Sequence, residues 1–258
     1  MTDAVADTDL LHEAKSLIDL ATERDIALRL VGGLAIRVLT PELPPRGRLA
    51  QDLDFASASS TRRALIEMLT EQGYDADKNF NALYGNKQLY FAHGNTGLAI
   101  DVLIDKLHMC HTVVFADRLT RMPYTLDAVD LLMSKLQIVE LNEKDARDTL
   151  HLLSGVPVSG SGAAGTGSGA SIDSDRFGKL LGADWGWWRT VTGSLKKLPT
   201  LAAEHPELLP PDPPYDAIAQ SGYLLELAES APKGVKWKLR ANVGDRVRWY
   251  ELPEEVDH

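Results

Sequence analysis

The chain has 258 residues, of which 44% are hydrophobic and 25% are charged, the balance of a globular protein with ample material for a core. Its net charge of −10 disfavours indiscriminate binding to nucleic acid or to anionic membranes, although a local basic patch is compatible with it. The sequence lacks a signal-peptide pattern and an apolar run of about 18 residues, and its one cysteine, Cys110, excludes an intrachain disulfide. We therefore expect a cytoplasmic protein with no membrane partner.

The first predicted element is an amphipathic helix over residues 9–24, because its apolar residues recur at helical spacing. The apolar residues up to Val31 then predict a strand, and Gly32 and Gly33 lead from it into a helix predicted over Leu34–Leu39. Two glycines at a strand-to-helix turn let backbone N–H groups approach a phosphate closely, and the helix dipole favours an anion there. Taken alone, such a pair is most often an ordinary tight strand-to-helix turn.

Two carboxylates follow, two residues apart, at Asp52 and Asp54. Residues 40–50 before them contain three prolines and a glycine, so they form a loop, and this loop carries Arg48 as a candidate phosphate ligand. Because strand side chains alternate, both aspartates face one side of a strand, about 6.6 Å apart along the chain. Such a pair is stabilised by a divalent metal, whereas a solvated strand edge is the alternative. A metal-binding carboxylate pair beside a phosphate-binding glycine turn is typical of enzymes that transfer phosphoryl or nucleotidyl groups.

A third acid lies inside a later apolar strand. The pattern before it predicts a helix and two short strands, over Ser60–Gln72, Asn81–Tyr84 and Lys87–Ala92. In the strand predicted over Gly97–Asp105, an acid in the middle, Asp101, is costly unless it is paired or binds a metal. Asp101 is therefore a candidate third ligand on a strand beside Asp52 and Asp54.

Two consecutive amphipathic helices are predicted next, over Thr125–Leu141 and Glu143–Leu153. Lys135 lies among apolar residues of the first helix. Asp145 and Asp148 lie one turn apart on the second helix, so both can face the same partner. A solvated helical face is the alternative, and it is the one favoured for Lys144.

The last hundred residues differ in composition. Residues 156–171 are rich in glycine, serine and alanine and are predicted to form a flexible linker, which divides the chain into residues 1–155 and a mainly helical domain over 172–258. Helices are predicted over Asp173–Leu181, Asp184–Leu198 and near Asp216–Ser230, with Pro199 ending the second. The tail over 233–251 carries six basic residues and interleaved tryptophans, and is predicted to be β-like. It is a candidate nucleic-acid contact, and a hairpin with a basic outer face is an equal alternative.

Taken in order, these motifs resemble the nucleotidyltransferase fold superfamily, and within it the toxin component of the type IV abortive-infection (AbiEii-like) toxin–antitoxin systems. The resemblance covers about the first 155 residues. The residues that carry it are Gly32, Gly33, Arg48, Asp52, Asp54, Asp101, Lys135 and the run Lys144-Asp145-Ala146-Arg147-Asp148.

The resemblance implies an α/β (α+β) fold in which a nucleotidyltransferase-like mixed sheet is flanked by helices, followed by a mainly helical C-terminal domain with a short β tail. It also implies an enzyme that moves a nucleoside monophosphate from a nucleoside triphosphate (NTP) to a hydroxyl acceptor. Asp52 and Asp54 would hold two Mg²⁺ or Mn²⁺ ions, and Asp101 would share one ion and help to deprotonate the acceptor. The nucleotide-binding residues would be Gly32, Gly33, Arg48, Lys135, Asp145 and Asp148. The implied acceptor is an RNA end, such as that of a tRNA, or a protein, and the implied partner is a cognate antitoxin.

The sequence departs from the family pattern in three places. Residues 34–51 form an unusually long separation between the glycines and the first aspartate, Ala50 stands where a small polar residue is common, and no arginine follows Lys135. These departures leave two alternatives open. The first is a nucleotide-binding or interaction module that keeps the fold without catalysis, and the second is a small-molecule nucleotidyltransferase, such as one that modifies an aminoglycoside.

Overall fold

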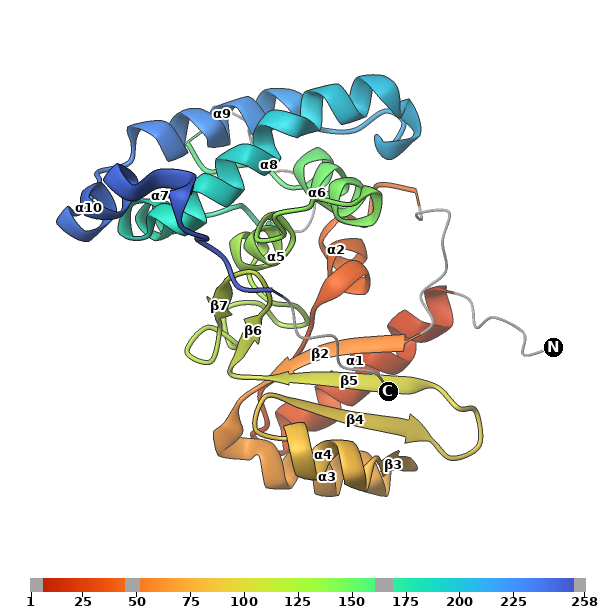
Figure 1. The fold of residues 1–258 in the computed structure, drawn as a ribbon. Coiled ribbons are helices and arrows are strands. Elements are labelled where there is room, and N and C mark those ends of the chain that lie inside the picture. The colour runs from red at the N-terminus through yellow and green to blue at the C-terminus, as the bar shows by residue number, and fades with distance from the viewer. Residues whose placement is uncertain (1–6, 45–51, 161–168, 253–258) are drawn as a thin grey trace.

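The computed structural model describes residues 7–44, 52–160 and 169–252. Its centre is a five-stranded sheet in the order β1-β2-β5-β4-β3, in which β2 and β5 are parallel and the other neighbours are antiparallel (Figure 1). The strands are β1 (Leu28–Leu30), β2 (Asp52–Ser57), β3 (Tyr74–Ala76), β4 (Gln88–His93) and β5 (Ala99–Ile104). A mixed sheet flanked by helices is the fold class predicted from the sequence.

Alternating side chains explain why β2 and β5 lie at the centre of the sheet. In β5 the residues Ile100, Val102 and Ile104 are buried on one face, whereas Asp101 and Leu103 are partly exposed on the other. In β2, Leu53 and Phe55 are fully buried and Asp54 faces the same side as Asp101. The apolar face fixes the register of the pair, and the opposite face is left for polar groups.

Helices surround the sheet on both sides. The N-terminal half contains α1 (Asp7–Glu23), α2 (Gly32–Leu39), α3 (Arg62–Glu71), α4 (Lys78–Tyr84), α5 (Ala128–Leu136) and α6 (Glu143–Gly155), with a short hairpin of β6 (Lys106–His108) and β7 (Thr112–Val114) before α5. Figure 1 shows α3 and α4 beside the β3–β4 edge, while α2, α5 and α6 lie between the sheet and the C-terminal helices.

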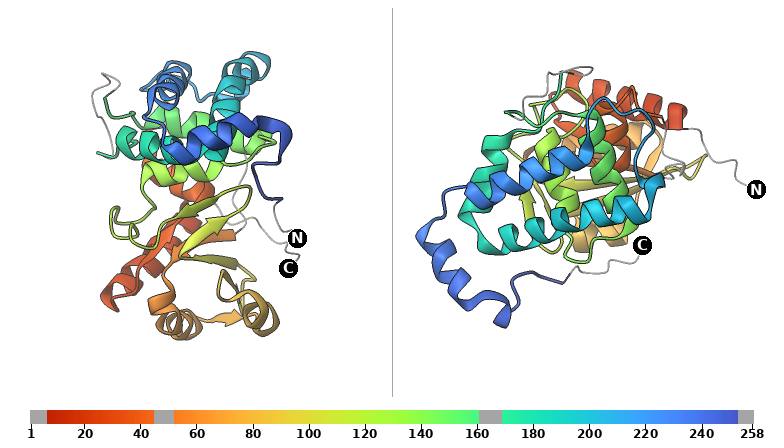
Figure 2. Two further views of the ribbon diagram at one scale, coloured as in Figure 1. Left: turned by 60° about the vertical axis from the view of Figure 1, so that its left-hand side comes forward. Right: turned by 90° about the horizontal axis from the view of Figure 1, so that it is seen from above.

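The C-terminal part is helical, as predicted. It consists of α7 (Ser174–Ala183), α8 (Trp185–Glu204), α9 (Ala217–Ser230) and α10 (Val235–Val243). Helices α8 and α9 pack on each other and form a layer over α5 and α6 (Figure 2). The side chain of Gln220 on α9 ties this layer to the end of α6, because it donates to the carbonyl groups of Leu153 and Val156 and accepts from the N–H of Val158.

Three predicted elements are corrected by the structure. Residues 81–84 belong to helix α4 rather than to a strand, because Asp77 caps that helix by accepting from the N–H groups of Asn79 and Phe80. The predicted β-like tail contains the helix α10. Pro199 does not end α8, which continues to Glu204 with Pro199 exposed on its solvent side and Ala202 still buried.

The predicted linker is described at both of its ends. Val156, Val158 and Ala170 are buried, and Val158 forms a β-bridge with Ile172, while residues 161–168 lie outside the described residues. The division into two domains stays a prediction.

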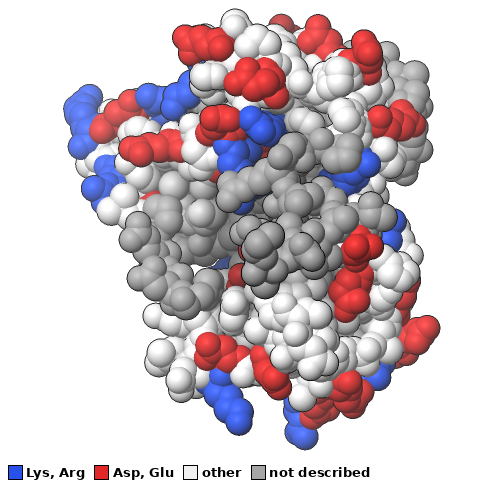
Figure 3. Space-filling view, turned by 90° about the vertical axis from the view of Figure 1, so that its right-hand side faces the viewer, with Lys and Arg blue, Asp and Glu red and all other residues white. Residues whose placement is uncertain are grey.

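No helix in the described ranges combines the length and the apolar character needed to cross a membrane. On the face shown in Figure 3, acidic and basic side chains are interspersed and do not form one continuous basic area. This distribution agrees with the acidic net charge of the chain.

Candidate metal and nucleotide site

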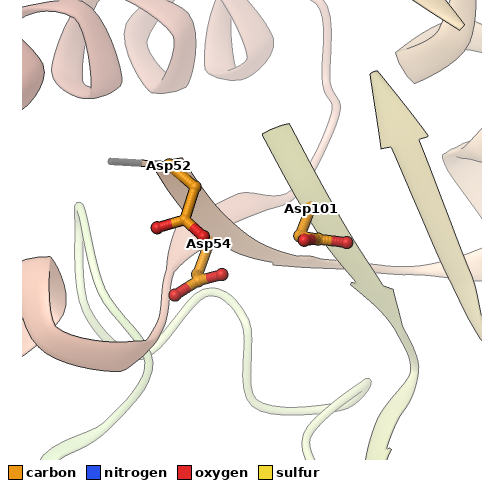
Figure 4. A group of neighbouring side chains, drawn as sticks. All are labelled: Asp52, Asp54 and Asp101. Carbon is orange, nitrogen blue, oxygen red and sulfur yellow. The ribbon is translucent and has the colours of Figure 1, made fainter. Parts of the chain in front are cut away.

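Three aspartates gather at one place on the exposed face of the central strand pair. Asp54 on β2 lies directly opposite Asp101 on β5, and Asp52 precedes Asp54 by one alternation of the same strand. One carboxylate oxygen from each of the three lies within 4.8 Å of the others. Figure 4 shows the three side chains on the same side of the two strands. The predicted proximity of Asp101 to the Asp52–Asp54 pair is therefore confirmed, while the catalytic role of the three stays a prediction.

The electrostatics of this cluster centre on Asp54. Burial and, after it, the negative charges of Asp52 and Asp101 raise the pKa of its carboxyl from 3.8 to about 6, while Lys144 and Lys135 act in the opposite direction. A divalent cation bound among these oxygens would supply positive charge that balances the three carboxylates. Hard carboxylate oxygens are also the ligands that Mg²⁺ and Mn²⁺ prefer, so the three residues fit such an ion.

Gly32 and Gly33 open helix α2 beside these carboxylates. Gly32 has a φ of +65°, a backbone conformation that favours glycine, and a Cβ built on it would lie 2.7 Å from Oδ2 of Asp54, so a larger residue would also have to displace that carboxylate. The backbone N–H of Val31, the residue before the helix, donates to the carbonyl oxygen of Asp54 at 2.9 Å. The N-terminus of α2, which carries unpaired N–H groups and the positive end of the helix dipole, is thereby held against the carboxylates.

Lys135, Asp145 and Asp148 come together at the junction of α5 and α6. The ammonium of Lys135, on the last turn of α5, lies 3.1 Å from Oδ1 of Asp145 and 2.9 Å from Oδ2 of Asp148. Asn142 caps α6 and also donates to Asp145. The prediction that both aspartates face one partner is confirmed, and that partner is Lys135. Lys135 and Asp145 line the pocket described below, whereas Asp148 is fully buried behind them.

One predicted residue cannot be placed, and two further residues belong to the site. Arg48 lies outside the described residues. The predicted solvated face fits Lys144, which is exposed, but this residue is also close enough to Asp54 to lower its pKa and it lines the pocket. Gln88 on β4 donates from Nε2 to Oδ1 of Asp101. No sequence pattern marks Gln88, because its position beside Asp101 follows from the pairing of β4 with β5.

A pocket of about 670 Å³ opens beside the carboxylates, a volume in the range of small-molecule sites. Its lining combines polar groups, which include Asp54, Asp101 and four lysines, with apolar side chains from the sheet, from the β6–β7 hairpin and from the segments that flank α5. The apolar and aromatic lining residues are Val31, Phe55, Tyr84, Leu103, Leu107, Met109, Val113, Phe115, Leu126 and Ile138. A pocket lined by carboxylates, lysines and apolar side chains suits a ligand that carries both phosphates and a ring.

Comparisons with known proteins add little to this geometry. A scan against protein-family models found no match, and a search of curated proteins found no relative. Among solved structures, the chain is similar to a STING-associated CdnE c-di-GMP synthase from Capnocytophaga granulosa. The match has 12% sequence identity, covers 92% of this chain and 82% of that chain, and has a TM-score of 0.29. A likeness this remote assigns no activity, so the function is inferred from the residues of the site.

Proposed function

We propose that this protein is a metal-dependent nucleotidyltransferase that moves a nucleoside monophosphate from an NTP to a hydroxyl acceptor. The observation that carries the proposal is the cluster of Asp52, Asp54 and Asp101 beside the glycine turn of α2. Three carboxylates share one cation-sized space, a helix N-terminus lies against them, and a pocket of nucleotide size opens at the same place.

The residues divide the work of such a reaction. The acceptor oxygen forms a bond to the α-phosphorus, the bond from that phosphorus to the bridging oxygen breaks, and pyrophosphate leaves. Asp52, Asp54 and Asp101 would hold Mg²⁺ or Mn²⁺, which supplies Lewis-acid stabilisation of charge on the phosphates when it is bound. Asp101 would receive the proton of the acceptor hydroxyl. The hydrogen bond that Gln88 donates to Asp101 would orient this carboxylate.

Phosphate binding belongs to the other side of the cluster. The N–H groups of Gly32 and Gly33 and the ammonium of Lys144 would bind the triphosphate, together with Arg48. Lys135, fixed by Asp145 and Asp148, would orient the nucleotide from the α5–α6 junction. The partly exposed apolar side chains of Leu107 and Met109 would contact the base.

The test is transfer of label from each of the four α-³²P NTPs, with Mg²⁺, to total cellular RNA, protein or aminoglycosides. The variants Asp54→Asn and Asp101→Asn are expected to lose at least about a thousandfold of the activity, since each removes a metal ligand. Asp75→Asn, an exposed aspartate on β3, serves as the matched control and keeps full activity. Equal activity in all three variants contradicts the proposal. Binding of NTP with no transfer to any acceptor favours the non-catalytic module instead.

A toxin role and a cytoplasmic location belong to the same proposal, and they rest on the sequence resemblance rather than on the site. If the activity is toxic, expression of the wild-type chain arrests growth and expression of Asp54→Asn does not. A cognate antitoxin would then be identified as a partner that relieves the arrest.

A further inference from the structure

We infer that the outer face of helix α10 is a docking surface for an acidic amphipathic helix of a partner protein. This α10 surface consists of an apolar row and two lysines beside it, namely Val235, Leu239, Val243, Lys236 and Lys238. It lies at the edge of the C-terminal helical layer, away from the sheet (Figure 1), and the residues that line the pocket do not include it. The inference therefore goes beyond the proposed function and does not depend on it.

The inner face of α10 is fixed to the rest of the protein by aromatic contacts. Trp237 packs edge-on against Trp188 of α8, with the ring centroids 5.2 Å apart. The guanidinium of Arg240 lies over the ring of Trp185, 4.6 Å from its centroid. These contacts determine which side of the helix faces the protein, so the residues on the opposite side face solvent.

The outer face of α10 carries the apolar row. Val235, Leu239 and Val243 are four residues apart, so they follow one side of the helix, and Trp237 points to the opposite side. The three side chains are 75%, 63% and 39% exposed, in chain order. Eight residues of helix make this row about 12 Å long.

Exposed apolar side chains are gathered in this part of the chain. Among the described residues, seven large hydrophobic side chains are exposed, and five of them lie within 235–252. Single exposed apolar residues are ordinary on a protein surface, whereas a gathered set is typical of an interaction site.

The α10 surface is basic in an otherwise acidic protein. Residues 235–248 contain five basic residues and one acid, Asp245, while the whole chain has a net charge of −10. Asp245 pairs with Arg189 of α8 at 2.9 Å, so it is not the counter-charge of Lys236 and Lys238, which are both exposed. At about 100° per residue, the two lysines fall on opposite sides of the apolar row.

An acidic helix with its own apolar row matches both properties. Its apolar residues, three and four apart, would cover the row of α10, and acidic residues beside them would meet Lys236 and Lys238. A second copy of this chain, packed symmetrically on the same surface, would instead bring lysine against lysine.

Nucleic acid and lipid match only one property each. Nucleic acid would pair with the lysines but would face an apolar row, and the ring of Trp237, which could stack on a base, is packed against Trp188. A bilayer would accept the row, but the row is aliphatic, whereas interfacial helices carry Trp and Phe, and the acidic remainder of the chain is repelled by anionic lipid.

The experiment selects binders on the full chain. A displayed library of random peptides of about 16 residues, enough for about four helical turns, is selected on wild type and depleted on Leu239→Ser. Fluorescent copies of the enriched peptides are then titrated by anisotropy with wild type, Val235→Ser and Lys236→Gln/Lys238→Gln. Leu83→Ser and Lys78→Gln, two exposed residues of α4, are the matched controls for the apolar and the basic substitutions.

We expect the surviving peptides to be acidic, with apolar residues at helical spacing. Val235→Ser and the double lysine variant should each bind them at least about tenfold more weakly, and the two controls should differ from wild type by less than about twofold. Added salt should weaken binding to wild type more than binding to the double lysine variant. The inference is overturned if no peptide survives depletion, if the survivors are neutral or basic, or if either α10 variant binds like wild type.

Three further measurements can overturn it. Thermal melts of Val235→Ser and Leu239→Ser should match wild type, and a melting temperature lower by more than about 4 °C would show that the row is packed inside the protein. Sedimentation with vesicles of phosphatidylcholine and phosphatidylserine, at about 7:3, should show no binding. Binding to these vesicles, or to oligouridine RNA, that is lost in the double lysine variant would assign the surface to lipid or to nucleic acid instead.

Discussion

At the scale of single residues, Asp54 predicts how stability depends on pH. Its pKa is about 6 in the folded protein and near 3.8 when unfolded, so the native state keeps a proton that the unfolded chain releases between these values. The free energy of unfolding contributed by this group is therefore fully present below about pH 4, falls as the pH rises to about 6, and is constant above that. A shift of this size corresponds to at most about 3 kcal/mol, and we expect about 1–2 kcal/mol because Asp54 is partly exposed.

Urea denaturation without divalent metal, at pH 4.5 and pH 7, measures this effect. Wild type is expected to lose about 1–2 kcal/mol relative to Asp54→Asn over that interval, because asparagine cannot acquire the charge. Millimolar Mg²⁺ at pH 7 is expected to restore stability to wild type and to leave Asp54→Asn nearly unchanged. Parallel pH profiles of wild type and variant would show that the pKa of Asp54 is not raised in the folded protein. Equal Mg²⁺ effects in the two would show that the three carboxylates do not share a cation.

The same residues show how far the sequence determines the site. Asp52 and Asp54 are recognisable because alternation puts them on one strand face, and Asp101 because an acid inside an apolar strand needs a partner. Their common location could not be read from the chain, since it depends on the parallel pairing of β2 with β5 across 46 intervening residues between Asp54 and Asp101. Gln88 and Lys106 escaped prediction for the same reason. In the sequence each is an ordinary polar residue, and only the positions of β4 and β6 in the fold place it at the pocket.

At the scale of elements, the α5–α6 junction depends on Lys135. Its ammonium is the counter-charge of Asp145 and of Asp148, which is fully buried. Lys135→Met removes that charge while keeping most of the apolar stem, and it leaves two acids without this partner. We expect a loss of about 3 kcal/mol of unfolding free energy at pH 7, because breaking a buried ion pair leaves an uncompensated charge.

Chemical denaturation of Lys135→Met beside Lys144→Met tests this expectation. Lys144 is exposed in the next helix, so its replacement is expected to change stability by less than about 0.5 kcal/mol. A loss in Lys135→Met no larger than that in Lys144→Met would show that the junction does not depend on this ion pair.

The elements that were predicted wrongly share a physical cause. In α10 the alternation Val235, Trp237, Leu239 imitates a strand, yet the structure uses it as a helix: Trp237 packs edge-on against Trp188 of α8, while Val235 and Leu239 are 75% and 63% exposed. In α4 the short apolar run resembles a strand, and the signal for a helix is the cap at Asp77. In both places tertiary contacts or a cap decide between two periodicities that a short segment cannot distinguish.

At the scale of the whole molecule, the residues before and after the predicted linker pack against each other. The prediction of two domains joined by a flexible linker does not include these contacts. Arg176 of α7 donates to Asp130 of α5, and α9 is tied to the end of α6 through Gln220. The buried side chains of α5, α6, α8 and α9 belong to one hydrophobic cluster that also contains those of the sheet. Separation of the halves would expose this surface to water at a cost of about 25 cal/mol per Å² of apolar area.

We therefore predict the outcome of limited proteolysis within residues 161–168. The glycine and serine composition of the segment favours cleavage there before other sites. Because the flanking residues pack into the shared cluster, the two fragments are expected to stay associated through size-exclusion chromatography and to separate only in denaturant. The control is Gln220→Ala/Arg176→Ala, which removes two of the ties and should weaken the nicked complex without changing the cleavage site. Fragments of the wild type that separate under native conditions would instead establish residues 1–155 and 172–258 as independent domains.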